Sequence, residues 1–425
     1  MDIVNIKSGG SVRTILDKHI LADGFDLVVD LDKSKGSYLV DLNTGKKYLD
    51  CFSQFASQPL GWNHPKVINQ KDRLGRIALH KVANSDCYCE EYAEFVEAFA
   101  ANAPDFKHFF FIDGGALAVE NTLKAAFDWK AQKLGIKDKQ SNELNVIYFK
   151  EAFHGRTGYT LSLTNNPTDN LKTRFFPKFN WTRVDNPKIT FPQNDDKVLN
   201  LEKMSLAKIE SILKKNKTAA ILMEPIQGEG GDNHFRKEFF QALRKLADKY
   251  EALLVMDEVQ TGVGLTGKMW AYEHFDFVPD MIAFGKKTQV CGICSTDRIN
   301  EVPHNVFKIS SRINSTWGGN LVDMTRCKIF LDIISEDNLI ENSKEVGEYF
   351  LEKLKNLPIS NVRGRGLMIA FDLEDETKRD AFLQKLLKKG VLALSCGQKS
   401  VRVRPHLTFS KENVNEAIDI IESSF

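Results

Sequence analysis

The chain has 425 residues, with 58 lysines and arginines against 57 aspartates and glutamates, so its formal net charge is +1. A hydrophobic fraction of 42% and a charged fraction of 27% are typical of a folded globular protein and exclude a disordered chain. The balanced charge also argues against a protein that coats nucleic acid, because phosphate binding needs a basic excess. At about 100–200 residues per domain, the length predicts two or three domains.

The N-terminus shows no basic stretch followed by an apolar one, so no signal peptide is predicted. The longest apolar runs, such as Ala252–Met256, are far shorter than the ~20 residues that span a bilayer. The seven cysteines are scattered, and only Cys291 and Cys294 have C-x-x-C spacing, which can indicate zinc or redox chemistry. No histidine cluster adjoins them, so we interpret the cysteines as structural thiols. We expect a reduced, cytoplasmic protein with no metal, nucleic-acid partner or membrane contact.

In chain order, residues 20–50 alternate short apolar runs with Gly and Asn, which predicts a β meander. From about residue 90, helical periods at Tyr92–Ala101 and Ala116–Lys133 alternate with short apolar runs. This alternation predicts an α/β fold with mainly parallel strands flanked by helices. The strands are expected at His108–Ile112, Asn145–Phe149, Ala219–Met223, Ala252–Met256 and Met281–Phe284.

After about residue 325 the pattern changes to long amphipathic helices. Strands follow near Gly366–Leu373 and Ser400–Val403, and a last helix begins at about Glu412. The sequence therefore predicts three parts. They are an N-terminal segment over residues 1–65, a large α/β domain over residues 66–322, and a smaller C-terminal α/β domain over residues 323–425.

Residues 262–268 contain a G-x-G-x-x-G pattern and most of a P-loop. A P-loop needs Ser or Thr after its lysine to reach Mg²⁺, and this position holds Met269. A dinucleotide fingerprint should leave its strand directly and open a helix, but five residues separate Met256 from Gly262. We interpret the segment as a glycine-rich turn that needs positive φ. A nucleotide-binding module remains a remote alternative.

Three chemically useful groups follow expected strands. Asp257 ends the run Ala252–Met256, and Lys286 and Lys287 follow the next run, after Gly285. Residues 113–116, Asp-Gly-Gly-Ala, lie between an expected strand and a helix, where free N–H groups and the helix dipole bind anions. An anion cup, an acid and a lysine at one sheet edge match the needs of pyridoxal 5′-phosphate. The cup binds the phosphate, the lysine binds the cofactor covalently and the acid keeps the pyridine nitrogen protonated.

Residues 253–267 and 279–286 also carry a family signature. The runs LLVMDEVQTGVGLTG and PDMIAFGK resemble the class III aminotransferases, the ornithine and 4-aminobutyrate group. The resemblance extends from Gly61 to Pro405 and implies a fold-type I pyridoxal-phosphate transferase. Within the class, residues 114–129, 283–292 and 314–320 are most similar to the L-lysine 6-aminotransferases. Most of the class has Ser-Gly at the cup, whereas this chain has Gly114-Gly115, as the lysine enzymes do.

The resemblance implies a role for each cofactor-binding residue. Its register selects Lys286 as the catalytic lysine, where the residues alone leave Lys287 equally possible. Asp257 is expected at the pyridinium nitrogen and Gln260 at the ring hydroxyl. The resemblance further implies that Phe153 stacks on the ring and that backbone N–H groups bind the phosphate, those of Gly115 and Ala116. Thr316 resembles a residue that reaches the phosphate of a partner chain, which implies a homodimer with shared sites.

The substrate residues follow from the same resemblance. Arg156 is expected to bind the distant carboxylate of the amino donor, since a guanidinium matches a carboxylate bidentately. Arg402 matches the arginine for the α-carboxylate, although Arg404 competes for this role. Glu229 is expected to mask that arginine while lysine binds and to move away for 2-oxoglutarate. Asn314 is also expected to contact substrate.

These expectations combine into one predicted activity. The chain is expected to transfer the ε-amino group of L-lysine to 2-oxoglutarate with pyridoxal 5′-phosphate. The same chemistry on ornithine or 4-aminobutyrate is the nearest alternative. A non-catalytic protein that binds pyridoxal phosphate is a remote one.

Overall fold

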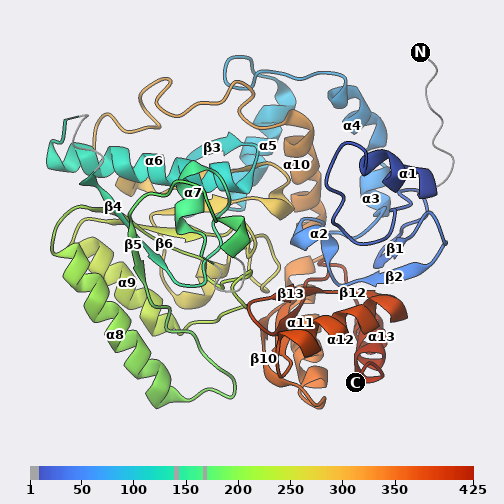
Figure 1. Ribbon diagram of the computed structural model, residues 1–425. Coiled ribbons are helices and arrows are strands. Elements are labelled where there is room, and N and C mark those ends of the chain that lie inside the picture. Colours follow the sequence, from blue (N-terminus) through green and yellow to red (C-terminus); the bar gives the residue numbers. More distant parts are fainter. Residues whose placement is uncertain (1–8, 138–142, 166–169) are drawn as a thin grey trace.

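The computed structural model describes residues 9–137, 143–165 and 170–425 (Figure 1). Its centre is a seven-stranded sheet in the order β3-β9-β8-β7-β6-β4-β5. The strands are β3 (His108–Ile112), β4 (Asn145–Phe149), β5 (Thr182–Val184), β6 (Thr218–Met223), β7 (Leu253–Asp257), β8 (Met281–Phe284) and β9 (Cys291–Ser295).

The pairing of this sheet is parallel except at β9, which runs antiparallel to both β3 and β8. The five strands expected from the sequence are present, with ends shifted by at most one residue. Strands β5 and β9 were not expected. The mainly parallel α/β architecture is confirmed.

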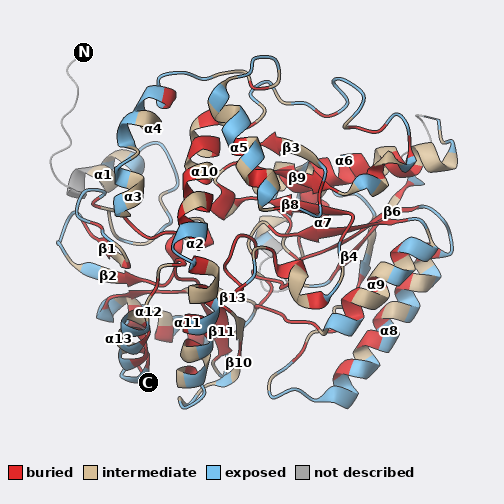
Figure 2. Ribbon diagram, turned by 180° about the vertical axis from the view of Figure 1, so that it is seen from behind, coloured by how far each residue is buried: buried red, intermediate tan, exposed pale blue. Residues whose placement is uncertain are grey.

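The central strands are buried on both faces because helices cover both sides of the sheet (Figure 2). Alternate residues of β7 pack into different cores: Leu254 and Met256 face one apolar cluster, and Leu253 and Val255 face the other. This two-sided burial explains why β7 is continuously apolar instead of alternating apolar and polar residues. The helices before residue 320 are α1 (Gly9–Leu16), α2 (Ser53–Ala56), α3 (Pro65–Ile68), α4 (Lys71–Ala78), α5 (Glu90–Ala101), α6 (Gly115–Leu134), α7 (Gly158–Leu163), α8 (Asp195–Leu213) and α9 (Lys237–Lys249).

The C-terminal part has its own antiparallel sheet, in the order β10-β11-β14-β13. A separate three-stranded sheet joins the two ends of the chain, because β12 pairs in parallel with β2 of the hairpin β1-β2. The expected meander therefore contributes two strands, and the third comes from beyond residue 390. The strands of these two sheets are β1 (Tyr38–Val40), β2 (Lys47–Asp50), β10 (Ser360–Arg365), β11 (Met368–Asp372), β12 (Val391–Leu392), β13 (Leu394–Cys396) and β14 (Ser400–Val403).

Helices α11 (Leu339–Leu354), α12 (Glu376–Lys389) and α13 (Lys411–Glu422) pack around these C-terminal strands. Helix α10 (Leu321–Glu336) precedes them and packs against α5 and α4 in the core of the large sheet. Short 3₁₀ helices lie in the connections of the large sheet, at η2 (Asn170–Lys172), η3 (Ala271–Phe275), η4 (Lys286–Thr288) and η5 (Asp297–Glu301).

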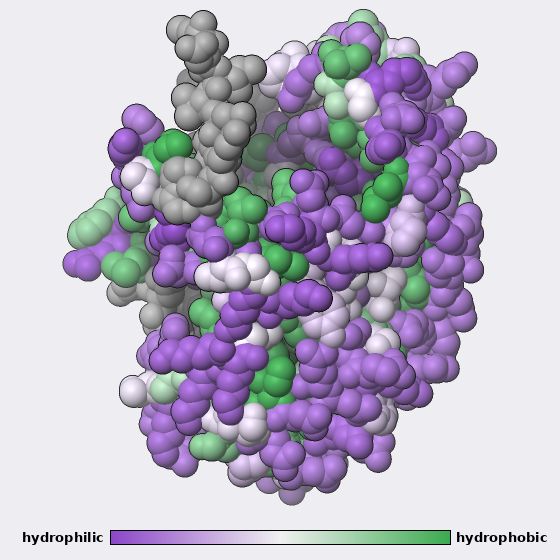
Figure 3. Space-filling model, turned by 90° about the vertical axis from the view of Figure 1, so that its right-hand side faces the viewer, coloured by the Kyte–Doolittle hydropathy of each residue, from purple (hydrophilic) through white to green (hydrophobic). Residues whose placement is uncertain are grey.

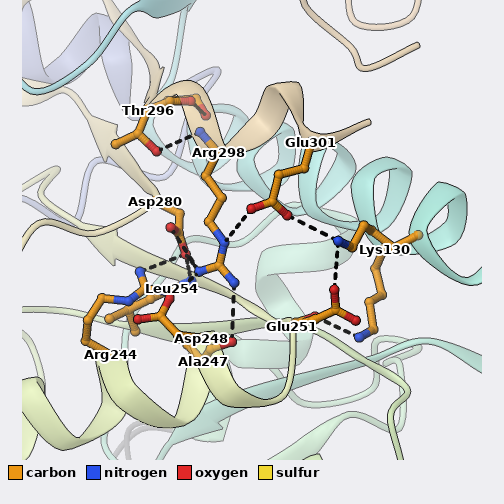
Figure 4. Close-up of polar contacts among 12 residues, drawn as sticks. Lys130, Arg244, Ala247, Asp248, Glu251, Leu254, Asp280, Thr296, Arg298 and Glu301 are labelled. Atoms are coloured by element: carbon orange, nitrogen blue, oxygen red, sulfur yellow. Dashed lines mark hydrogen bonds and ion pairs between the residues drawn. The ribbon is translucent and has the colours of Figure 1, made fainter. Parts of the chain in front are cut away.

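A network of ion pairs stabilises the edge of the sheet where β7 and β8 begin (Figure 4). Buried Asp280 accepts a hydrogen bond from the backbone N–H of Leu254 at 2.6 Å. Its carboxylate also pairs with Arg244 at 2.8 Å and Arg298 at 3.1 Å. The buried charge of Asp280 is thus compensated, and the network connects α9, β7 and η5. The opposite edge of the sheet is free to carry other chemistry.

The exposed face seen in Figure 3 is mostly hydrophilic, with hydrophobic residues scattered among the polar ones. In the part of the chain that the structure describes, no helix is both long and apolar enough to cross a membrane. The seven cysteines are all free thiols, and five of them are buried. Cys291 and Cys294, the two cysteines with C-x-x-C spacing, both lie within β9.

Candidate active site

A cavity of about 830 Å³ opens at the carboxyl edge of the large sheet, where β7 and β8 end. This is the edge at which parallel α/β proteins place their ligand sites. The cavity receives residues from seven separate segments of the chain. Its lining comprises Gln54, Phe55, Ser57, Gly114, Gly115, Ala116, Phe153, His154, Gly155, Arg156, Lys172, Glu224, Ile226, Glu229, Asp257, Val259, Gln260, Thr261, Lys286, Gln289 and Cys291.

Lys286 and Lys287 follow β8 but face different surroundings. Lys286 lines the cavity, whereas the Nζ of Lys287 is buried and donates to the carbonyls of Gln260 at 3.0 Å and Gly262 at 2.8 Å. Burial, together with the charge of Arg402, lowers the pKa of Lys286 to about 8. At pH 7 roughly a tenth of an amine with this pKa is uncharged, far more than for an exposed lysine, and this uncharged form can act as a nucleophile or base. The geometry therefore favours Lys286 over Lys287.

Asp257 is the last residue of β7 and is only 5% exposed. Its Oδ2 lies 2.7 Å from Nδ1 of His154, and its Oδ1 accepts the backbone N–H of Val259 at 3.1 Å. These contacts hold the carboxylate in one orientation at the cavity wall. The sequence singled out Asp257 but not His154, whose pairing depends on a strand that lies far away in the chain.

Glu224 is a second buried acid that the sequence did not single out. It follows β6, and its two oxygens accept the backbone N–H groups of Phe153 at 2.9 Å and Gly228 at 3.0 Å. Burial raises the pKa of Glu224 to about 7. Its hydrogen bonds position the loop that carries Phe153 and the loop that leads to Glu229.

The expected anion cup lies at the start of α6. Gly114 precedes the helix with φ +107°, a conformation that favours glycine, and Gly115 and Ala116 line the cavity. A Cβ on Gly115 would approach Cγ1 of Val259 to 2.9 Å, so the close packing requires glycine. The helix that follows has 20 residues, and its N-terminal N–H groups and dipole favour a bound anion at this point.

Gln260 also reaches the cavity. Its Oε1 is buried without a hydrogen-bond partner among the described residues. A buried amide oxygen without a partner is costly, so it indicates a group that donates a hydrogen bond when the site is filled. Phe153 lines the same cavity, as expected, and His154 and Gly155 follow it there.

The two candidate carboxylate arginines lie on or next to β14 and have different partners. Arg404 forms a buried ion pair with Asp232 and donates to the carbonyls of Ile369 and Val403. Arg402 is 4% exposed, and its Nη2 donates to Oε2 of Glu229 at 2.9 Å. Because the charge of Arg404 is already compensated inside the protein, the geometry favours Arg402 for substrate.

Glu229 is bound by two cations. Its Oε2 accepts from Arg402, and its Oε1 accepts from Nζ of Lys172 at 2.8 Å. Burial alone would raise the pKa of Glu229, but the charges of Arg402 and Lys172 lower it below its ordinary value. The structure thus shows the contact between Glu229 and Arg402 that the expected masking requires, and the masking itself stays a prediction. Lys172 was not expected.

Arg156 lies at the cavity mouth and is exposed. It also lines a neighbouring cavity of about 500 Å³. Within the described residues it forms neither an ion pair nor a hydrogen bond, so its guanidinium is available for a ligand carboxylate. The structure therefore places Arg156 at the site, with its guanidinium unpaired among the described residues.

Asn314 and Thr316 are exposed and lie outside the cavity lining. The Oδ1 of Asn314 accepts the backbone N–H of Ser315 at 2.7 Å, and the carbonyl of Thr316 accepts from Oγ of Ser85 at 2.9 Å. A single chain thus does not bring these two residues to its own cavity. Their roles, like those of the other site residues, stay predictions.

Gln54 and Phe55 reach the cavity from α2, which the sequence did not indicate. Residues 53–56 all have positive φ, between 40° and 63°, so they form a left-handed turn. Non-glycine residues adopt this conformation at a cost of roughly 1–2 kcal/mol each, and no glycine marks the turn. One local and one distant hydrogen bond hold it: the N–H of Ser53 donates to Oδ1 of Asp50 at 2.7 Å, and Oγ of Ser53 donates to the carbonyl of Arg404 at 2.5 Å.

The residues present fit pyridoxal 5′-phosphate. A lysine with a lowered pKa, a carboxylate oriented at the wall, an unpartnered amide oxygen and an anion-binding helix N-terminus all face one cavity. Each corresponds to one functional group of the cofactor, namely its aldehyde, its pyridine nitrogen, its hydroxyl and its phosphate. Lys286, Asp257, Gln260 and Gly115 would hold these groups in that order.

Comparison with known proteins agrees with this chemistry. The sequence matches the family described as aminotransferase class-III over residues 21–425. The chain belongs to the class-III aminotransferases. Its cofactor is pyridoxal 5′-phosphate, and the resemblance inferred from residues 253–267 and 279–286 is confirmed.

This class-III aminotransferase has similar relatives over nearly its full length. It is 46% identical to the L-lysine-epsilon aminotransferase of Amycolatopsis lactamdurans, over 97% of this chain and 95% of that protein. It is 45% identical to the L-lysine-epsilon aminotransferase of Streptomyces clavuligerus, over 97% of this chain and 93% of that protein. Its fold matches the lysine aminotransferase of M. tuberculosis, solved in its internal aldimine form, with a TM-score of 0.94 and 44% identity over 98% and 99% of the two chains.

Proposed function

We propose that this class-III aminotransferase transfers the ε-amino group of L-lysine to 2-oxoglutarate. The products would be L-glutamate and 2-aminoadipate 6-semialdehyde, which cyclises to piperideine-6-carboxylate. The relatives named as L-lysine-epsilon aminotransferases support lysine as the donor. The observation that carries the proposal is the covered Arg402, because it suits a donor that presents no carboxylate beside its reacting carbon.

Pyridoxal 5′-phosphate, when bound, withdraws electrons from the carbon that carries the transferred amine. The chain supplies the proton transfer at that carbon. Nζ of Lys286, with a pKa of about 8, can accept a proton from the ε-carbon of lysine and would deliver it to the cofactor carbon that takes up the amino group. Asp257, oriented by His154 at 2.7 Å, would hold the pyridine nitrogen of the cofactor at the cavity wall. Gly115 and Ala116 anchor the phosphate end.

One cavity must accept two different substrates in turn, which predicts ping-pong kinetics. L-Lysine presents an uncharged chain next to the reacting ε-carbon, and Glu229 keeps Arg402 neutralised there. 2-Oxoglutarate presents a carboxylate next to its reacting carbon, so Glu229 must leave Arg402 to let the carboxylate bind. A movable charge of this kind gives specificity by disfavouring the wrong substrate. The exposed Arg156 would bind the far carboxylate of either substrate.

The proposal includes a homodimer in the cytoplasm. Asn314 and Thr316 lie outside the cavity of their own chain, which is consistent with a contribution to the site of a partner chain. If so, neither chain completes a site alone. The seven free thiols fit a reducing compartment.

The test compares amine donors at a fixed concentration of 2-oxoglutarate. L-Lysine should give the highest kcat/KM, and trapping of the cyclic imine product should account for all of the glutamate formed. If L-ornithine or 4-aminobutyrate were the better donor, the lysine assignment would be wrong and the family assignment would remain.

The remote alternatives have less support. The turn at residues 262–267 has φ +78° at Gly264 and +81° at Gly267, as expected for a glycine-rich turn. The N-terminal N–H groups that could bind an anion belong to α6 at the cavity, not to this turn. A protein that only binds the cofactor would not need Glu229 at the cavity wall in an ion pair with Arg402.

A further inference from the structure

Glu229 lies between two cations that come from different parts of the fold. Arg402 belongs to β14 of the C-terminal sheet, whereas Lys172 ends η2 of the large sheet's connections. Each cation uses a different oxygen of the carboxylate, at 2.9 Å for Arg402 and 2.8 Å for Lys172. Glu229 can therefore break its contact with Arg402 without breaking its contact with Lys172.

The burial of the three side chains is unequal. The side chain of Arg402 is 4% exposed, that of Lys172 is 18% exposed and that of Glu229 is 23% exposed. A carboxylate that left Arg402 in this setting with no second cation would be a largely buried, unpaired charge, which is strongly unfavourable. Lys172, on a long and flexible stem, compensates the charge of Glu229 after such a move. It lines the same cavity and lies 5.9 Å from the ring centroid of Phe153.

We propose that Lys172 is a positioning residue for Glu229, which stabilises the position of Glu229 that uncovers Arg402 and so favours the dicarboxylate substrate. Lys172 thus acts on the 2-oxoglutarate half-reaction and leaves the lysine half-reaction alone, since Arg402 stays covered there. This inference rests on the proposed exchange of lysine for 2-oxoglutarate in one cavity.

Two other roles for Lys172 make different predictions. If Lys172 bound a substrate carboxylate directly, its loss would lower the affinity for that substrate whether or not residue 229 carries a charge. If Lys172 only anchored its segment, its loss would slow both half-reactions together. Only the positioning role makes its effect depend on the carboxylate of Glu229.

The experiment measures both half-reactions and one binding equilibrium on the cofactor-loaded enzyme. Lys172→Met and Lys172→Gln are each reacted with L-lysine alone, and their aminated forms with 2-oxoglutarate alone, by following the absorbance of the cofactor. The dissociation constant of glutarate, an unreactive dicarboxylate, is measured by calorimetry. Loss of a charge-assisted hydrogen bond should lower the affinity for 2-oxoglutarate and for glutarate about tenfold. The rate constant of the reaction with L-lysine and the apparent affinity for L-lysine should not change.

The Glu229→Gln variant tests whether the effect of Lys172 depends on the carboxylate of Glu229. In Glu229→Gln, adding Lys172→Met should leave the affinity for glutarate unchanged, because the neutral amide no longer needs a second cation. Lys172→Arg should retain most of the dicarboxylate affinity. Lys237→Met is the matched control, since it removes a lysine from an exposed pair with Asp276 at 3.1 Å, outside the cavity.

Equal loss in both half-reactions, or a full Lys172→Met effect in the Glu229→Gln background, would overturn the positioning role. Failure of the proposed function has a different signature. The wild-type enzyme would then not react with L-lysine, while glutarate binding would still decide the role of Lys172.

Discussion

The ionisation of Lys286 is set by its surroundings and has a measurable consequence. Burial and the charge of Arg402 lower its pKa to about 8. The charged form therefore dominates below pH 8 and the nucleophilic form above it, whereas an exposed lysine would change near pH 10.4.

In the cofactor-free protein, the rate of covalent pyridoxal 5′-phosphate attachment should rise with pH around a midpoint near 8 and then level off. Stopped-flow absorbance measures this rate. A rate that continued to rise through pH 10 would contradict the lowered pKa. Lys286→Ala should abolish both the attachment and transamination, and Lys287→Ala should leave the absorbance of the attached cofactor in place.

Glu229 determines, in our proposal, which amino group of lysine reacts. Glu229→Gln keeps the shape of the side chain but removes the charge that neutralises Arg402. The uncovered arginine should then attract the α-carboxylate of lysine and promote transfer from the α-carbon. We expect the ratio of ε- to α-amino transfer to fall about tenfold, which corresponds to roughly 1.4 kcal/mol. Chromatography of the two oxo products measures this ratio, and an unchanged ratio would argue against the masking role.

At the scale of elements, two helical glycines have opposite surroundings. A Cβ on Gly347 in α11 would overlap the carbonyl of Gly366, whereas a Cβ on Gly75 in α4 would meet nothing within 4 Å. Alanine is favoured over glycine in a helix by about 1 kcal/mol. A Gly→Ala substitution in a helix should therefore stabilise the protein unless the added Cβ clashes with its neighbours.

Gly347→Ala should therefore lower the stability of the protein by roughly 1–3 kcal/mol, the usual cost of overpacking, and Gly75→Ala should raise it. Thermal unfolding of the cofactor-loaded enzyme compares the two variants. Equal shifts of the two midpoints would show that α11 can move away from the loop of Gly366.

The strands of the large sheet could be predicted because each is a short, continuous apolar run. Strand β9 was missed because Gly292 and the two cysteines weaken its apolar pattern. Strand β10 was missed because its residues, Ser-Asn-Val-Arg-Gly-Arg, are mostly polar and pair at the edge of a sheet. Helix α2 is unpredictable for another reason, since its left-handed turn is imposed by contacts with distant residues such as Arg404.

At the scale of the whole molecule, three regions contribute to the cavity and its wall. Lys286 and Asp257 line it from the large sheet and Phe55 lines it from the N-terminal segment. Arg402 of the C-terminal sheet pairs with the lining residue Glu229. The guanidinium of Arg402 lies 5.9 Å from the ring centroid of Phe55. Pairing of β12 with β2 connects the last two regions directly.

A shared dimeric site predicts complementation between two defective chains. Lys286→Ala inactivates its own site, and Thr316→Val should impair the site of the partner chain. In a mixed dimer one site carries both defects and the other carries neither. Mixing the two variants under conditions of subunit exchange should restore activity that neither variant has alone. Mixtures that stayed as inactive as their components would exclude a contribution of Thr316 across the interface.

Several features were determined by the sequence alone. The apolar runs determined the parallel strands, and the residues after them determined that Asp257 and Lys286 share one sheet edge, because carboxyl ends of parallel strands meet there. Tertiary structure decided what spacing cannot encode. It separated Lys286 from the buried Lys287 and Arg402 from the paired Arg404, because the two members of each pair are neighbours in sequence but face different environments. It also brought His154, Glu224 and Lys172 to the cavity, since their partners lie more than fifty residues away.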